Sequence, residues 1–240
     1  MTLNNPVDPE VWTKARLVEP LPSGFVHLSI SAGGWPIPPA LPSGRRRRAR
    51  KRLHELAAAI GNDVIDATVF TALVRAPGGR EAAAEVAYDL VLLVETSSVE
   101  RARELVSSTT WRSRVDPLIQ TSSAHLEFVA SNIQRMASVD HSRRGVFLFN
   151  YFSAPTVEAN LFAWQYTAGW FQDQTGLDNS TVLEPEDDGP FSLVNHCRWD
   201  HLADVMPKLV FARSFREFVL RVFDENRVKP RPLLFRISRG

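Results

Sequence analysis

The fold is decided by two similar stretches in different halves of the chain, Tyr88–Ser97 (YDLVLLVETS) and Phe191–Asp200 (FSLVNHCRWD). Each reads as a strand that runs into a helix, and the helices carry Trp111 and Phe215 respectively. Each strand also follows an earlier strand, a helix and another strand, so both halves read β-α-β-β-α-β. A four-stranded sheet with helices on one face leaves its other face bare. Two such faces in one chain can bury each other.

The first half contains a strand in which Val26, Leu28 and Ile30 point to one side, because side chains alternate along a strand. A helix follows, with its apolar stripe ending at Ile60 before the stop residue Gly61. The remaining strands of this half are predicted at 63–75, 87–95 and 124–132, with a helix from Ser97 or Ser98 between the last two.

The second half repeats the pattern, with strands predicted at 145–152, 180–183, 191–198 and 232–237. Its first helix begins near Val157 and stops at Gly176, which is followed by an apolar residue. Pro207 is expected to interrupt the helical region that follows the third strand.

The amino-acid composition limits the classes of protein to which this chain can belong. The chain has 240 residues, 44% apolar and 23% charged, which is typical of a globular protein with one large or two small domains. A single cysteine, Cys197, excludes an internal disulfide framework and a cysteine-rich zinc site. No stretch reaches the roughly 20 apolar residues that span a bilayer, and no secretory signal is visible. We therefore expect no membrane partner and a cytoplasmic location.

The expected organisation has three parts. Residues 1–22 contain four prolines and read as an N-terminal arm. Residues 23–140 and 141–240 form the first and the second repeat.

This order of elements resembles two ferredoxin-like repeats of the dimeric α+β barrel superfamily, fused in tandem over residues 23–239. The resemblance lies in element order and in strand and helix patterning, and no catalytic signature common to the superfamily is present. It implies an α+β fold whose antiparallel sheets pack as an intramolecular barrel. Known relatives include antibiotic-biosynthesis-type monooxygenases, polyketide cyclases, stress-responsive proteins and haem proteins. That variety means that the fold does not name a chemistry.

The strongest candidate for chemistry is the strand that contains Asn195, His196 and Arg198, because the matching strand Leu90–Glu95 is almost wholly apolar. Alternation puts His196 and Arg198 on one face, with Asn195 on the other. As catalytic residues, His196 would move a proton and Arg198 would hold a carboxylate, an enolate or a phosphate. The alternative is an internal polar network, with Asp200 capping the next helix.

The candidates for ligand binding are Asn195, Tyr151, His27 and Trp35, and packing is the alternative for the last three. Asn150 replaces Leu28 by repeat correspondence, and Tyr151 falls on the opposite side of the same strand. Tyr151 and His27 would bind a ligand or fill the core. Trp35 lies in a long loop rich in proline and glycine, where it would cover the barrel end or plug it.

The run Arg45–Arg52 places seven cations within eight residues near the start of a helix, which is unfavourable to the helix dipole. We expect a solvated helix face with acidic partners inside the protein. A net charge of +1 and the lack of an aromatic RNA-binding signature argue against a nucleic-acid partner.

Three functions fit these observations. The first is a small-molecule-binding barrel that acts as a cofactor-independent monooxygenase or cyclase on an aromatic or polyketide-like metabolite. The second is a noncatalytic ligand-binding or protein-interaction module. The third is haem binding through His196 or His201. We expect no cofactor and no metal, and we include a homo-oligomer among the expected assemblies. Whether the protein is an enzyme stays open.

Overall fold

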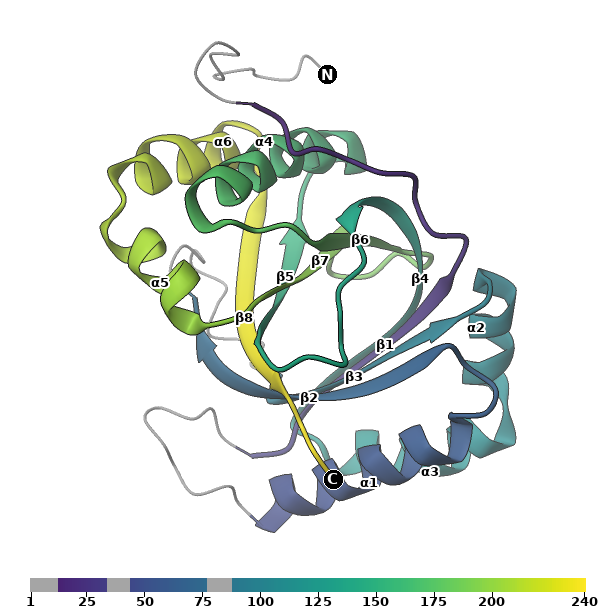
Figure 1. Cartoon of the computed structure of the whole chain (residues 1–240). Coiled ribbons are helices and arrows are strands. Elements are labelled where there is room, and N and C mark those ends of the chain that lie inside the picture. Colours follow the sequence, from purple (N-terminus) through teal and green to yellow (C-terminus); the bar gives the residue numbers. More distant parts are fainter. Residues whose placement is uncertain (1–12, 34–43, 77–87) are drawn as a thin grey trace. The chain divides into compact units, whose positions relative to one another are not determined.

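The protein has an α+β fold, which is described from a computed structural model for residues 13–33, 44–76 and 88–240. The strands in these residues hydrogen-bond in the order β1-β3-β2-β8-β5-β7-β6-β4, which is a closed antiparallel barrel (Figure 1). The chain divides into two compact units. The N-terminal unit comprises Leu21–Val74, Ala82–Asn132 and Phe235–Gly240, and the C-terminal unit comprises Met1–Pro20, Arg75–Glu81 and Ile133–Leu234.

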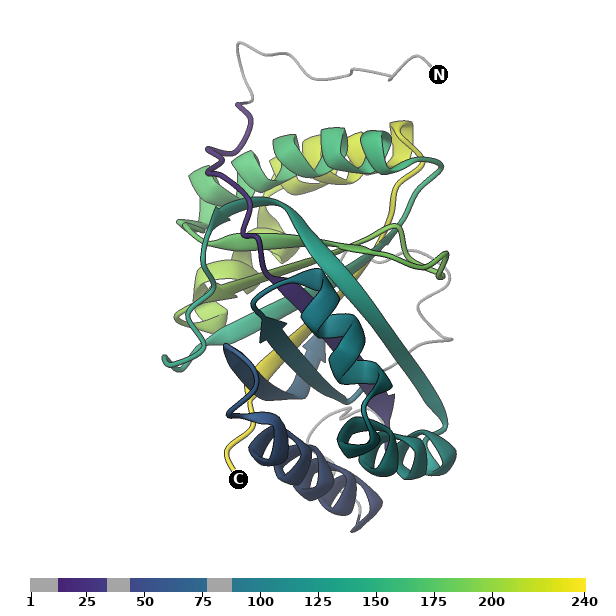
Figure 2. The same ribbon diagram turned by 90° about the vertical axis from the view of Figure 1, so that its right-hand side faces the viewer.

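The N-terminal unit is built from one βαββαβ repeat, as the sequence predicted. Its elements are β1 (Gly24–Ser31), α1 (Gly44–Ile60), β2 (Asp66–Arg75), β3 (Leu90–Thr96), α2 (Val99–Ser107), α3 (Thr109–Thr121) and β4 (Ala124–Ala137). β1 pairs with β3 and β4, and β3 pairs with β2, all antiparallel. The sheet order β4-β1-β3-β2 is ferredoxin-like. Figures 1 and 2 show α1, α2 and α3 on one face of this sheet.

The core of the N-terminal unit lies between this sheet and its helices. Val26, Leu28 and Ile30 of β1 are fully buried against the apolar stripe of α1, which includes Leu53 and Leu56. Both sets follow the spacing that the sequence predicted, period two on the strand and 3.6 on the helix. Helix α2 begins at the N-cap Ser98, whose side chain accepts a hydrogen bond from the Arg101 backbone N–H.

The cationic run occupies the first half of α1, and only part of it has acidic partners. Arg46 is buried and forms an ion pair with Asp89, and Lys51 pairs with Glu55 one turn later. No ion pair within the described residues involves Arg45, Arg47, Arg48, Arg50 or Arg52. The expectation of acidic partners is therefore confirmed for Arg46 and Lys51. The first turn of α1 contains no acidic residue.

Replacing Arg45 by glutamate should stabilise the protein. The substitution removes a positive charge from the first turn of α1 and adds a negative one, which favours the helix dipole by about 0.3–1 kcal/mol at low salt. Urea unfolding at low and at high salt measures this gain, which salt should reduce. Arg52→Glu is the matched control, since it changes the charge equally but lies beyond the first turn. An equal gain in both variants would show that repulsion within the run, and not the dipole, is the cause.

The C-terminal unit repeats the element order. It contains β5 (Val146–Ser153), α4 (Val157–Thr175), β6 (Ser180–Pro185), β7 (Leu193–Trp199), α5 (Leu202–Phe211), the π-helical turn η2 (Phe215–Leu220), α6 (Arg221–Glu225) and β8 (Lys229–Ile237). The strand order β8-β5-β7-β6 matches that of the first repeat. Residues 13–20 run along this unit, where the Ala15 backbone N–H donates to the Gln165 carbonyl oxygen at 2.9 Å.

Two helix ends test the local predictions. Helix α4 stops at Gly176, whose left-handed backbone (φ 69°) is favourable for glycine, as predicted. The expectation that Pro207 interrupts the next helix is wrong, because α5 continues through it to Phe211. Proline at this position removes only the bond to the carbonyl of Ala203, which lies in the exposed first turn.

The repeat boundaries 23–140 and 141–240 stay predictions. No helix within the described ranges is long and apolar enough to cross a bilayer.

Candidate functional site

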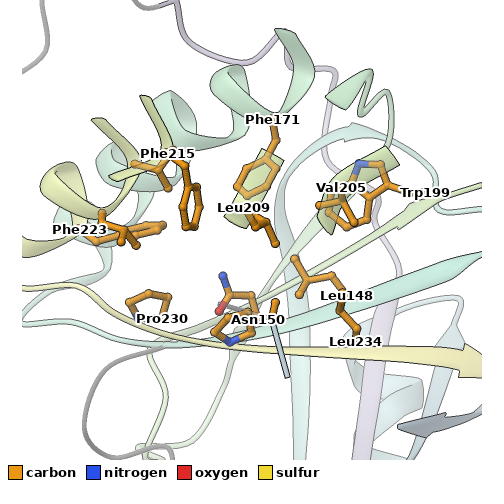
Figure 3. Close-up of a pocket in the computed structure, with 14 residues that line it drawn as sticks. Leu148, Asn150, Phe171, Trp199, Val205, Leu209, Phe215, Phe223, Pro230 and Leu234 are labelled. Carbon is orange, nitrogen blue, oxygen red and sulfur yellow. The ribbon is translucent and has the colours of Figure 1, made fainter. Parts of the chain in front are cut away.

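An apolar cavity of about 30 Å³ lies in the C-terminal unit, between the sheet and the helices that cover it (Figure 3). This volume holds one or two water molecules. The strands contribute Leu148, Asn150, Trp199, Pro230, Pro232 and Leu234, the helices contribute Phe171, Val205, Leu209, Phe215, Val219, Leu220 and Phe223, and Ala76 completes the lining. The cavity therefore has an aromatic and aliphatic wall with one amide.

Asn150 is the polar exception in this wall. It sits in β5 opposite Asn195 of β7. Its Oδ1 is buried and accepts no hydrogen bond from any described residue. A buried oxygen of this kind carries a desolvation cost of about 1–3 kcal/mol, which a bound donor would offset. Figure 3 shows the Asn150 amide at the floor of the cavity, below Phe171 and Phe215.

The roof of the cavity is formed by the turn η2 and its neighbours. Phe215, at the start of η2, packs against Trp170 and Phe171 of α4, with ring centroids 5.6 and 6.4 Å apart. A π-helical turn is less favourable than an α-helical one and often marks a functional region. The element that covers the cavity is therefore a π-helical turn and not a regular α-helix.

A second hollow, a polar cleft of about 300 Å³, lies in the same unit. Its charged residues are Asp140, Arg143, Asp178, Arg198, Asp200 and Asp204, and Ala137, Ser138, Thr175, Gly176, Asn179 and Trp199 complete it. Arg198 is 6% exposed, and its guanidinium donates to the Asp200 carboxylate and to the Arg144 carbonyl oxygen. The hydrogen bond from Arg198 holds the pKa of Asp200 below its usual range.

His196 lies on the face of β7 that also carries Arg198, as alternation predicted, and it lines neither hollow. Its ring stacks on Phe149 at 4.2 Å between centroids and on Phe147 at 5.9 Å. Nδ1 lies 3.0 Å from the Leu148 carbonyl oxygen and Nε2 lies 2.9 Å from Nε2 of His141. The histidine is therefore enclosed by aromatic rings, and both of its ring nitrogens have partners.

The other predicted residues do not gather at one place. Asn195 faces the helices, and its Oδ1 accepts from the Ser180 hydroxyl at 2.5 Å. Tyr151 is buried on the opposite face, with its ring 5.2 Å from that of Phe191. His27 belongs to β1 in the other unit, where it stacks on Phe128 at 4.8 Å between centroids. Trp35 lies outside the described residues.

The proposed cap of α5 by Asp200 is wrong. The N-cap residue is His201, whose backbone N–H donates to Asp204 Oδ2 at 2.8 Å. Asp200 instead accepts hydrogen bonds from Arg198 and Arg143, because its carboxylate is close to both guanidinium groups.

Within the described parts of the chain, no group of three or more His, Cys, Asp or Glu residues is arranged to hold a metal ion. His196 does not fit the role of a haem ligand, since both ring nitrogens are engaged. Burial raises the pKa of the Cys197 thiol, so the reactive thiolate is disfavoured.

Sequence reasoning identified Asn150 but missed the residues around it. The phenylalanines at 171, 215 and 223 lie on helical spacing that is equally typical of a filled core. The only signal at this position was the asparagine in β5 where the first repeat has Leu28. His141 gave no signal, since it lies in a polar connection between β4 and β5.

Comparison with protein-family models and with curated proteins gives no match. Solved structures do match. An anthrone oxidase-like protein superposes with a TM-score of 0.65 at 12% identity, covering 90% of this chain and 91% of that chain. A proposed monooxygenase from Fusobacterium nucleatum subsp. nucleatum gives a TM-score of 0.58 at 4% identity, over 91% and 94% of the two chains. A chlorite dismutase variant from Candidatus Nitrospira defluvii gives 0.49 at 10% identity, over 92% and 93%.

The chain has the fold of the dimeric α+β barrel proteins, as the order of its elements predicted. At identities this low the likeness concerns the fold alone. What the protein binds must be argued from its own cavities.

Proposed function

We propose that the C-terminal unit binds a planar, largely apolar small molecule in the cavity that contains Asn150. The observation that supports this proposal most is the buried Asn150 Oδ1, which has no partner within the described residues although the rest of the wall is apolar. An apolar pocket with one polar group is the usual design of a small-molecule site, in which the polar group fixes the orientation.

Binding requires the cavity to widen. A tricyclic aromatic molecule is several times larger than 30 Å³, so some of the wall must move. The side chains of η2, Phe215 in particular, are the ones that we expect to move, because this turn is π-helical. A ligand of this size would therefore select a conformation with a wider cavity.

The reaction that suits this environment is oxidation of the ligand by O₂ without a cofactor, as the first sequence hypothesis suggested. An anthrone is a suitable substrate class, since its ring methylene becomes a carbonyl when one oxygen atom is added and the other leaves as water. The electrons come from the substrate. A hydroxyl on the ring system, such as that of the anthranol tautomer, would donate to the unpartnered Asn150 Oδ1 and fix the orientation of the ligand.

The same cavity favours the noncatalytic alternative in one respect. Among the described residues that line it, none has a titratable side chain, so the lining supplies no general base. The substrate proton must leave to solvent or to a group outside the lining. His196 and Arg198 stay proposed for proton transfer and anion binding, with Arg198 bordering the adjacent cleft.

The experiment compares the wild type with Asn150→Leu, which restores the residue of the first repeat. Anthrone binding is followed by titration calorimetry in the absence of O₂. We expect affinity about tenfold weaker in Asn150→Leu, because one hydrogen bond in a dry site is lost. Asn160→Leu is the matched control, since Asn160 is buried in α4 outside the lining.

Two further results decide between the hypotheses. Equal affinity in Asn150→Leu and the wild type, or no binding by the wild type, would contradict the proposed site. O₂ consumption with anthrone, measured with an oxygen electrode, separates oxygenation from binding alone. Binding without O₂ consumption supports the noncatalytic alternative.

We also propose that the protein self-associates and that it is located in the cytoplasm. The exposed side chains of Leu202, Val210 and Phe211 on α5 support self-association, and Phe211 is 79% exposed. Light scattering on the purified protein measures the oligomeric state. We keep the cytoplasm as the expected location, which cell fractionation would check.

A further inference from the structure

The outward side of α1 carries a dense group of cations, Arg45, Arg47, Arg48 and Arg52, which we call the cationic face. All four side chains are exposed, and no ion pair within the described residues involves any of them. In Figure 2, α1 lies beside α3, and no described element covers its outward side. The cationic face therefore lacks an acidic partner in the described part of the chain.

The positive charge of α1 is felt by the side chains around it. The first turn of the helix contains no acidic residue, so nothing there opposes the positive end of the helix dipole. Burial lowers the pKa of His54, and the positive charge of Arg50, one turn earlier, lowers it further. Burial is also the main cause that lowers the pKa of Arg46, and Arg236 and Arg50 add to it. An anionic partner would offset this repulsion.

The two units of the chain differ in charge. The N-terminal unit, which contains α1, has 13 lysines and arginines against 10 aspartates and glutamates. The C-terminal unit has 15 against 17. The net charge of +1 therefore results from a positive and a negative unit that nearly cancel. The chain itself supplies a surface of the charge that α1 lacks.

That negative surface is most concentrated in the connection after β6, where Glu186, Asp187 and Asp188 are consecutive and exposed. We call these three residues the acidic turn. No ion pair within the described residues involves Asp187 or Asp188. The Ser153 hydroxyl donates to the Pro190 carbonyl oxygen at 2.8 Å, which ties the end of this connection to β5. The acidic turn is therefore an anchored group of carboxylates.

We propose that the cationic face of one copy of the protein binds the acidic turn of a second copy. The lengths agree, because the cations from Arg47 to Arg52 span about 7.5 Å of helix axis and three residues of extended chain span at most about 10 Å. The contact is electrostatic, and it joins two different surfaces. Neither surface contributes a residue to the cavity, so this inference does not depend on the proposed function.

The side chains of α1 favour this occupant over nucleic acid or lipid. Apart from its charged residues, the exposed positions of α1 are Gly44, Ala58 and Ala59. No described side chain on this side can stack on a base or insert into a lipid layer. An acidic segment of protein requires neither.

Sedimentation velocity of the wild type at low and at high salt is the first test. We expect the dissociation constant of self-association to rise at least about tenfold at high salt, because salt screens contacts between exposed charges. The apolar side chains of α5 form a separate surface, and association through them should persist at high salt. Self-association with the same dissociation constant at both salt concentrations would overturn the inference.

Charge reversal on α1 locates the contact. The combined variant Arg47→Glu, Arg48→Glu and Arg52→Glu, the α1-reversed variant, should associate at least about tenfold more weakly at low salt. Acidic residues near the start of a helix favour its dipole, so the helix is retained.

The matched control reverses three other exposed cations of the N-terminal unit, on α2 and α3, and changes the net charge equally: Arg101→Glu, Arg103→Glu and Arg114→Glu. We expect it to associate like the wild type. An equal loss in the control and in the α1-reversed variant would mean that net charge, and not the cationic face, is the cause.

A charge swap identifies the second partner. The combined variant Glu186→Lys, Asp187→Lys and Asp188→Lys, the turn-reversed variant, should lose association to the same extent as the α1-reversed variant. An equal mixture of the two variants should recover the wild-type dissociation constant to within about threefold, because opposite charges meet again in each mixed pair. Recovery also shows that both variants are folded.

Two further results would overturn the inference. One is a mixture that associates no better than the separate variants. The other is a wild type that does not self-associate but binds duplex DNA or vesicles of anionic lipid, measured by fluorescence anisotropy and by co-sedimentation, with loss of that binding in the α1-reversed variant. The cationic face would then belong to a polyanion and not to a second copy.

Discussion

Replacing Arg46 by methionine is expected to lower the free energy of unfolding by about 3–5 kcal/mol, since the substitution leaves a buried carboxylate without its cation. The carboxylate belongs to Asp89, which is 1% exposed. Arg46 Nε lies 3.7 Å from Asp89 Oδ2, and Arg46 Nη2 also donates to the Ala72 carbonyl oxygen at 3.2 Å. Burial raises the pKa of Asp89 and lowers the pKa of Arg46, so desolvation opposes the pair.

Urea unfolding of three variants checks this expectation. Arg47→Met removes an exposed cation from the next position of α1 and should change the free energy of unfolding by less than about 0.5 kcal/mol. Arg46→Met combined with Asp89→Leu should recover most of the loss, because no buried charge remains. A loss below about 1 kcal/mol in Arg46→Met alone would mean that Asp89 finds another partner or is neutral.

Lowering the pH should destabilise the folded protein, because His27 is buried as a neutral side chain. This residue of β1 is fully buried, and burial lowers its pKa from 6.5 to about 3. The folded chain therefore keeps His27 neutral where the unfolded chain protonates it. The stability that neutral His27 contributes to the folded protein is fully present above the pKa of this histidine in the unfolded chain. It is lost as the pH falls from 6.5 toward 3. At pH 5 the loss amounts to about 2 kcal/mol, at 1.36 kcal/mol for each pH unit.

His27→Leu should reduce the difference in unfolding free energy between pH 7 and pH 5 by about 2 kcal/mol, measured by urea unfolding at both values. Leucine keeps an apolar group against Phe128 and cannot bind a proton. His125→Gln is the control, since His125 is exposed on β4. A variant with the acid sensitivity of the wild type would show that His27 is charged or solvated in the folded protein.

The fold was predictable from the sequence because each repeat carries its pattern locally. The alternation of Val26, Leu28 and Ile30 placed one face of β1 against helices, and the stripe through Leu53 and Leu56 placed α1 on that face. Each pattern depends on neighbouring residues, so no knowledge of distant contacts was needed. The glycine stop at 176 was predictable for the same reason.

The site was predictable only in part. Alternation correctly separated His196 and Arg198 from Asn195. It did not show which face of β7 borders a cavity, because η2 and α5 line that cavity and their packing is a tertiary property. Asn150 was identifiable by comparison with Leu28, whereas the orientation of Trp199 in the cavity wall depends on its hydrogen bond to Thr175, 24 positions earlier in the chain.

Leu28 and Asn150 occupy equivalent positions in the two repeats, and this difference has a genetic consequence. When a barrel is assembled from two identical chains, a polar substitution in a strand appears in both halves, and the cost of burying it is incurred twice. In a single gene that encodes both repeats, the first copy can keep leucine for the core while the second acquires an amide. Selection can then change ligand preference through one copy without weakening the other.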